Sequence, residues 1–104
     1  MEEMKEKYKN LHRLFAAYLH QDWTVEGSSL SEVFRNKKGL QNLAPKIHAE
    51  INDLLSGEYG NDYLDRLFVR KWHTGYEPDE DAGEDWGDVL EQISRICREY
   101  MTSS

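Results

Sequence analysis

The residues best placed to do chemistry are carboxylates gathered in one short stretch. Residues 77–91, which we call the acidic segment, hold eight Asp or Glu and no Lys or Arg. Before them, acidic and basic residues balance at 11 each, so the net charge of −7 arises in the acidic segment. Carboxylates concentrated in this way can bind a metal ion, stabilise a helix start or face a positively charged partner.

The spacing of these acids excludes a calcium-binding EF-hand. Counted from Asp79, that loop needs glycine at its centre and a bidentate acid at its end, but these places hold Glu84 and Leu90. The four histidines show no His-Glu-x-x-His or other metal-binding spacing. No Gly-x-Ser-x-Gly elbow and no glycine-rich phosphate loop after a strand is present. We therefore expect no metal, no cofactor and no enzyme activity.

Two interpretations of the acidic segment remain open. Acids near a helix start meet the positive end of its dipole, so Asp85 and Asp88 could serve the helix alone. The acids that precede them repel one another, and this costs stability unless a positive partner relieves it. We favour the second interpretation, a partner-binding acidic face. The residues predicted for this face are Tyr76, Glu77, Asp79, Glu80, Asp81, Glu84, Asp85 and Asp88.

Length and composition narrow the class of protein. The 104 residues suit one small domain with a single core, and the lone cysteine, Cys97, excludes an internal disulfide. The acidic N-terminus is unlike a secretory signal, and the longest apolar run, Phe15–Leu19, is too short to span a membrane. Net negative charge disfavours direct contact with nucleic acid. We predict a cytoplasmic protein whose partner is another protein.

Helical periodicity runs through nearly the whole chain. Apolar residues recur at steps of three and four, and almost no alternating strand pattern occurs, which predicts an all-α bundle of about five helices in one domain over residues 1–104. The predicted helices begin and end near residues 4–19, 30–36, 40–55, 61–72 and 84–100.

Residues at the predicted helix ends support this division. Ser29 suits the N-cap of the second helix, and Gly39 belongs to the stretch that stops it. Pro45 suits the first turn of the third helix and Gly57 its C-terminal cap. Gly75 is expected to end the region of the fourth helix.

The segment Tyr18-Leu19-His20-Gln21-Asp22-Trp23 resembles the CdiI-type immunity proteins of bacterial contact-dependent growth inhibition. These small proteins bind and neutralise a cognate toxin domain. Residues 49–55 are similar to the family's central helix, which ends in a leucine pair. Gly75-Tyr76-Glu77-Pro78, followed by Asp85-Trp86, is similar to its Gly-aromatic-x-Pro loop before a last helix that contains Trp. The acidic segment is more charged than in an ordinary member of the family.

The resemblance implies a mechanism without catalysis, in which the chain covers the active region of the toxin domain of a large secreted protein. Many such toxins act on nucleic acids, so we expect a nuclease whose positive groove meets the acidic face. Tyr76 or Tyr59 would supply aromatic anchors. The alternative function is a small acidic adaptor or regulator that binds another basic protein.

The Tyr-x-His-Gln-Asp-Trp segment itself is expected to serve the fold. Tyr18 continues the apolar stripe of the first helix, and Trp23 is predicted to close the core below that helix. Asp22 or His20 would fix the turn through hydrogen bonds to the backbone.

Overall fold

The computed structural model describes residues 6–19, 23–25, 27–57 and 59–102, and no strand occurs in these ranges. Its elements, in chain order, are α2 (Lys9–Arg13), η1 (Leu14–Tyr18), η2 (Trp23–Val25), α3 (Leu30–Asn36), α4 (Lys38–Ser56), α5 (Asn61–Asp65), η3 (Arg66–Lys71), η4 (Glu80–Ala82) and α6 (Trp86–Thr102). η1 and η3 are π-helical turns that continue α2 and α5, whereas η2 and η4 are short 3-10 turns. The all-α prediction is confirmed.

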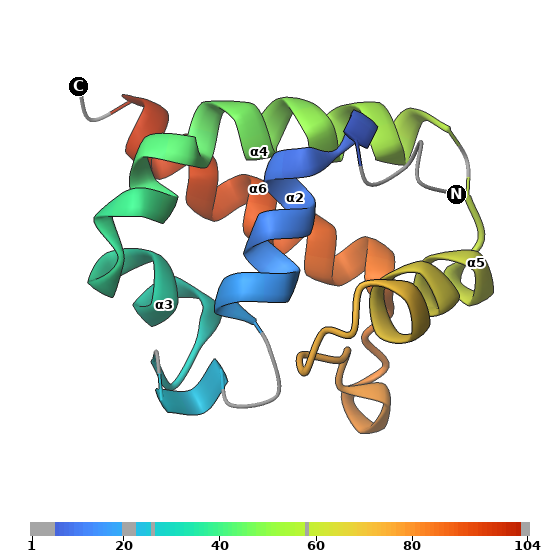
Figure 1. Ribbon diagram of the computed structural model, residues 1–104. Coiled ribbons are helices and arrows are strands. Elements are labelled where there is room, and N and C mark those ends of the chain that lie inside the picture. The colour runs from blue at the N-terminus through green and yellow to red at the C-terminus, as the bar shows by residue number, and fades with distance from the viewer. Residues whose placement is uncertain (1–5, 20–22, 26, 58, 103–104) are drawn as a thin grey trace.

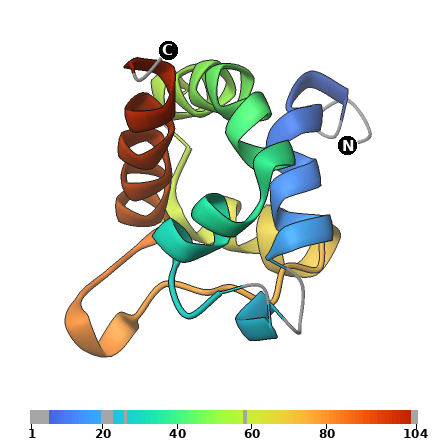
Figure 2. The same ribbon diagram turned by 90° about the vertical axis from the view of Figure 1, so that its left-hand side faces the viewer.

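The two long helices, α4 and α6, pack against each other and form the spine of the bundle (Figure 1). α2 crosses in front of them, with α3 toward one end of the molecule and α5 toward the other. Seen from the side, α6 and α2 lie on opposite sides, and the loop around η4 projects away from the helices (Figure 2). The apolar stripes predicted from the sequence therefore face one shared core.

Aromatic side chains hold the centre of that core. Phe15 of η1 stacks on Phe68 of η3 with ring centroids 4.6 Å apart, and Phe68 lies 4.7 Å from the ring of Trp86. All three side chains are fully buried. Burial of each such ring contributes about 1.5–3 kcal/mol to folding. This cluster joins three helical segments that are far apart in the sequence.

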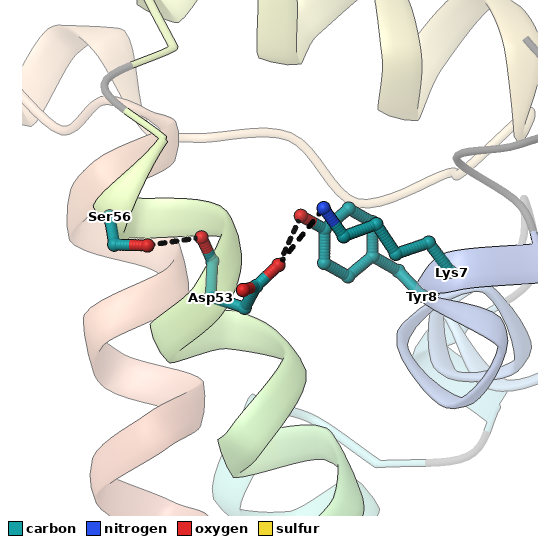
Figure 3. A network of polar contacts seen from close by, with 4 residues as sticks. All are labelled: Lys7, Tyr8, Asp53 and Ser56. Carbon is teal, nitrogen blue, oxygen red and sulfur yellow. Dashed lines mark hydrogen bonds and ion pairs between the residues drawn. The ribbon is translucent and has the colours of Figure 1, made fainter.

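Two acids of α4 hold the start of α2. The Glu50 carboxylate accepts hydrogen bonds from the backbone N–H of Leu11 at 2.8 Å and from the Asn10 amide at 2.6 Å. The Tyr8 hydroxyl donates to Oδ2 of Asp53 at 2.7 Å (Figure 3). A helix start leaves N–H groups without intrahelical partners, and Glu50 accepts two of them, from Asn10 and Leu11. The stretch 49–55 thus fixes where the first helix lies.

Gly39 and Pro45 do not lie where the sequence predicted, although α3 ends at Asn36 as expected. The break between α3 and α4 is the single extended residue Lys37, so Gly39 lies in the first turn of α4 and does not end α3. A Cβ on Gly39 would come within 3.1 Å of the Tyr18 hydroxyl, so a larger residue there would require Tyr18 to shift by a few tenths of an ångström. Pro45 lies inside α4 and not in its first turn. There it has no N–H to donate to the carbonyl of Gln41.

Two other predicted ends are confirmed. Ser29 is the N-cap of α3 and its Oγ accepts the N–H of Glu32, while Gly57 is the C-cap of α4. Gly75 does not end the fourth helical region: η3 ends at Lys71 with Trp72 as its C-cap, and His73, with φ of 55°, takes the left-handed backbone conformation. Met4 and the predicted turn contacts of His20 and Asp22 lie outside the described residues.

Candidate partner-binding site

The acidic segment and the end of the Tyr-x-His-Gln-Asp-Trp segment both come after a helix that ends in a π-helical turn. In η1 the N–H of Leu19 donates to the carbonyl of Leu14 at 2.9 Å, and in η3 the N–H of Trp72 donates to that of Leu67 at 3.0 Å. Both bonds span five residues, so each helix widens in its last turn. In the chain, η2 follows the first of these turns and the acidic segment follows the second.

Hydrogen bonds join these two helix ends. The Leu19 carbonyl accepts the N–H of Gly75 at 2.7 Å and the hydroxyl of Thr74 at 2.8 Å. The Thr74 Oγ1 also accepts the N–H of Tyr76 at 3.2 Å, and this side chain is buried. A buried carbonyl at a helix end needs such partners. The base of the acidic segment is thereby attached to the end of the first helix.

Trp23 of η2 and Tyr76, which follows Gly75, contact each other, with ring centroids 5.1 Å apart in an edge-to-face arrangement. Both rings are only half-buried and pack at the margin of the core. The prediction that Trp23 is a core residue is therefore wrong. Its half-buried ring packs against Tyr76 at the margin of the core. Burial, followed by the charges of Glu84 and Asp79, raises the pKa of Tyr76.

Asp79 and Glu84 shape the projecting loop. The Asp79 carboxylate accepts the N–H of Ala82 at 3.3 Å, and the N–H of Asp79 donates to the Glu84 carboxylate at 3.0 Å. The Asp79 carbonyl accepts the N–H groups of Ala82 and Glu84, with Gly83 in the left-handed region at φ 78°. Glycine takes that conformation without strain. Two of the predicted face residues thus also hold the loop in place.

Asp85 and Asp88 cap α6. The N–H of Asp88 donates to Oδ1 of Asp85 at 2.9 Å, and the N–H of Asp85 donates to Oδ2 of Asp88 at 3.1 Å. This reciprocal pair is the arrangement of a capping box, and it satisfies N–H groups that the first turn leaves without partners. Both carboxylates also meet the positive end of the helix dipole. For these two residues the structure favours the helix-stabilising interpretation.

Four predicted face residues meet in one cleft. We call it the acidic cleft; its volume is about 330 Å³ and it is lined by Asn61, Asp65, Glu77, Pro78, Asp79, Asp81, Glu84 and Trp86. Tyr76, Asp85 and Asp88 do not line it, and the side chain of Glu80 lies outside the described part of the chain. Glu77 and Asp81 are exposed, and neither makes a hydrogen bond or ion pair to any described residue.

Two lining residues escaped the sequence analysis because they come from α5. Oδ1 of Asn61 accepts the backbone N–H of Trp86 at 2.8 Å, and Oδ1 of Asp65 accepts its indole N–H at 3.0 Å. The available signal was their spacing of four, which places both on one face of a helix. Asp65 adds a fifth carboxylate to the acidic cleft.

The acidic cleft is chemically suited to a positively charged side chain. Five carboxylates and no basic residue line it, so a guanidinium or ammonium group would find several charge-assisted acceptors. Within the described ranges no group of His, Cys, Asp and Glu is arranged to hold a metal ion. A search of the same ranges for a helix long and apolar enough to cross a bilayer also found none.

Comparison with known proteins identifies the family. The model of the family described as CdiI immunity protein matches residues 7–102. The chain belongs to this family, which gives it an immunity role against contact-dependent growth inhibition toxins, and the predicted resemblance is confirmed. Neither the curated proteins nor the solved structures gave a significant match.

Proposed function

We propose that this immunity protein neutralises a nuclease toxin by laying its acidic face over the groove that binds phosphates. The observation that supports this most strongly is the acidic cleft, which gathers carboxylates from α5 and from the acidic segment. A nuclease needs a positive surface for its substrate, and the acidic face would compete for that surface. The protein would act by occlusion, without chemistry of its own.

Charge would serve recognition more than affinity in this complex. Opposite fields speed the encounter of two proteins and disfavour wrong partners, and the rate gain falls as salt is added. Affinity would come from side chains buried at the centre of the contact. Tyr76 and Trp23, half-buried beside the loop, are the aromatic groups nearest to that role.

The direct test is inhibition of the cognate toxin domain. The purified toxin domain should cleave nucleic acid alone and stop when an equal amount of the immunity protein is added. Excess DNA or RNA present before mixing should delay inhibition, because substrate and inhibitor would share one groove. A toxin without nuclease activity, or a complex that still cleaves, would contradict the proposal.

The adaptor alternative makes a different prediction for the same protein. A chain that regulates another basic protein would capture that protein from the cytoplasm of a cell lacking the toxin gene. Membership of the immunity family favours the toxin as partner. Capture of the toxin domain alone, in cells that hold both, would separate the two functions.

A further inference from the structure

A second cavity, of about 410 Å³, lies between α4 and α6 and shares no lining residue with the acidic cleft. Its polar lining consists of His48, Asn52, Glu91, Ser94, Arg95 and Arg98. Two of these side chains come from α4 and four from α6, the pair of helices that forms the spine of the bundle. The proposed toxin contact uses none of them.

A chain of hydrogen bonds orients the hydroxyl of Ser94. The amide nitrogen of Asn52 lies 3.2 Å from Nε2 of His48, and Nδ1 of His48 lies 2.7 Å from Oγ of Ser94. An amide nitrogen can only donate, so Nε2 accepts and the ring proton sits on Nδ1. Nδ1 then donates to Ser94, whose own proton remains for another acceptor. Ser94 is only 8% exposed, and it lines the cavity.

The charges around this hydroxyl are mostly positive. Arg95 and Arg98 are exposed and three positions apart on α6, so they lie on one side of the helix. Glu91 offsets one of the two charges. The lining therefore carries a net positive charge in a chain whose overall charge is −7. Guanidinium groups and a hydroxyl together are donors for an anion with several oxygen atoms.

We propose that this cavity binds a phosphate group. Arg95 and Arg98 bring two guanidinium groups to the lining, and a phosphate, with three or four oxygens and up to two charges, matches two positive charges better than a carboxylate with one charge. The cavity exceeds the size of the free ion, so a phosphate monoester such as a nucleoside monophosphate also fits. The ligand class is thus inorganic phosphate or a phosphate monoester.

Titration of the full chain with inorganic phosphate, followed by the amide NMR signals of α4 and α6, tests this site. Saturable shifts should appear at Asn52, Ser94 and Arg95. The double variant Arg95→Gln/Arg98→Gln should weaken binding about ten-fold or more. Its matched control, Arg66→Gln/Arg70→Gln, removes two exposed charges from η3 and should change the dissociation constant by less than about two-fold. Glu91→Gln should tighten binding because it removes the one repelling charge.

Three results would overturn the proposal. Equal weakening by both double variants would show that phosphate responds only to the overall charge of the protein and that the cavity is not a specific site. Acetate binding as tightly as phosphate would assign the cavity to carboxylates. Shifts that do not saturate would remove the site altogether. A parallel titration with adenosine monophosphate distinguishes a phosphate monoester from inorganic phosphate as the ligand. If adenosine monophosphate binds more tightly than inorganic phosphate, the cavity is a monoester site. If the two bind equally, the ligand is the free ion.

Discussion

The hydroxyl of Tyr8 donates a 2.7 Å hydrogen bond to Oδ2 of Asp53 across 45 residues of sequence (Figure 3). Lys7 approaches the same oxygen at 3.5 Å, but both charged side chains of that pair are more than half exposed, so it adds little. The tyrosine itself is buried, and burial, followed by Asp53, raises its pKa. One bond thus links the first helix to the long central helix.

Tyr8→Phe should destabilise the protein by about 1 kcal/mol, because it removes this hydrogen bond and keeps the buried ring. Urea denaturation, with the midpoint compared at an unchanged slope, measures the loss. Tyr18→Phe, at a half-buried hydroxyl for which no side-chain hydrogen bond is seen among the described residues, is the matched control. A midpoint for Tyr8→Phe equal to that of the parent would contradict the assigned role.

The same bond makes stability depend on pH. The Tyr8 hydroxyl, aided by Lys7, holds the pKa of Asp53 below its ordinary value. The unfolded chain therefore takes up this proton first as the pH falls. The stabilisation is complete above the ordinary pKa, and is lost as the pH drops through the folded pKa. An NMR titration of the Asp53 carboxyl carbon should show the low pKa in the parent and a higher one in Tyr8→Phe; identical titrations would refute the coupling.

Thr74→Val should cost about 1–3 kcal/mol, because the Tyr76 N–H loses its acceptor and the Leu19 carbonyl loses one donor. Thr74→Ser keeps the hydroxyl and should recover most of that loss. Hydrogen exchange at Gly75 and Tyr76 should speed up in the valine variant and stay slow in the serine variant. Equal exchange in both would mean that the hydroxyl does not hold the loop.

Trp86→Ala should destabilise far more than Trp23→Ala. The Trp86 ring is fully buried and its indole N–H donates to Asp65, so its removal should cost about 3–5 kcal/mol. Trp23 is half-buried at the margin of the core, so about half that cost or less is expected. Chemical denaturation ranks the two variants, and the reverse order would place Trp23 in the core.

Helix number and the buried faces were predictable, because periodic apolar residues reflect which side of a helix meets the core. The boundary errors have local causes. Tyr18 closely approaches Gly39, and a close contact from elsewhere in the chain cannot be told from a helix stop in one sequence. The widened turn before Leu19 ends where the Leu19 carbonyl accepts tertiary hydrogen bonds from Thr74 and Gly75. No local pattern predicts such turns.

The candidate site was predictable in its charge but not in its shape. Counting acids located the segment, and nearness to a helix start marked Asp85 as a possible cap, but the sequence could not decide between that role and the partner-binding face. Nor could it find Asp65, which arrives from another helix and is placed by its bond to Trp86. Sequence reports which charges are near in the chain, whereas the fold decides which of them share a surface.

The rate of association with the toxin domain, measured against salt concentration, tests the acidic face most directly. Glu77→Gln/Asp81→Asn removes two cleft charges that make no hydrogen bond to the described residues. Glu6→Gln/Glu99→Gln removes two exposed charges, ahead of α2 and near the end of α6, that do not line the cleft. The cleft pair should slow association about three- to ten-fold at low ionic strength and flatten its salt dependence. The control pair should change both far less. Equal effects of the two pairs, or none from the cleft pair, would contradict binding through the acidic face.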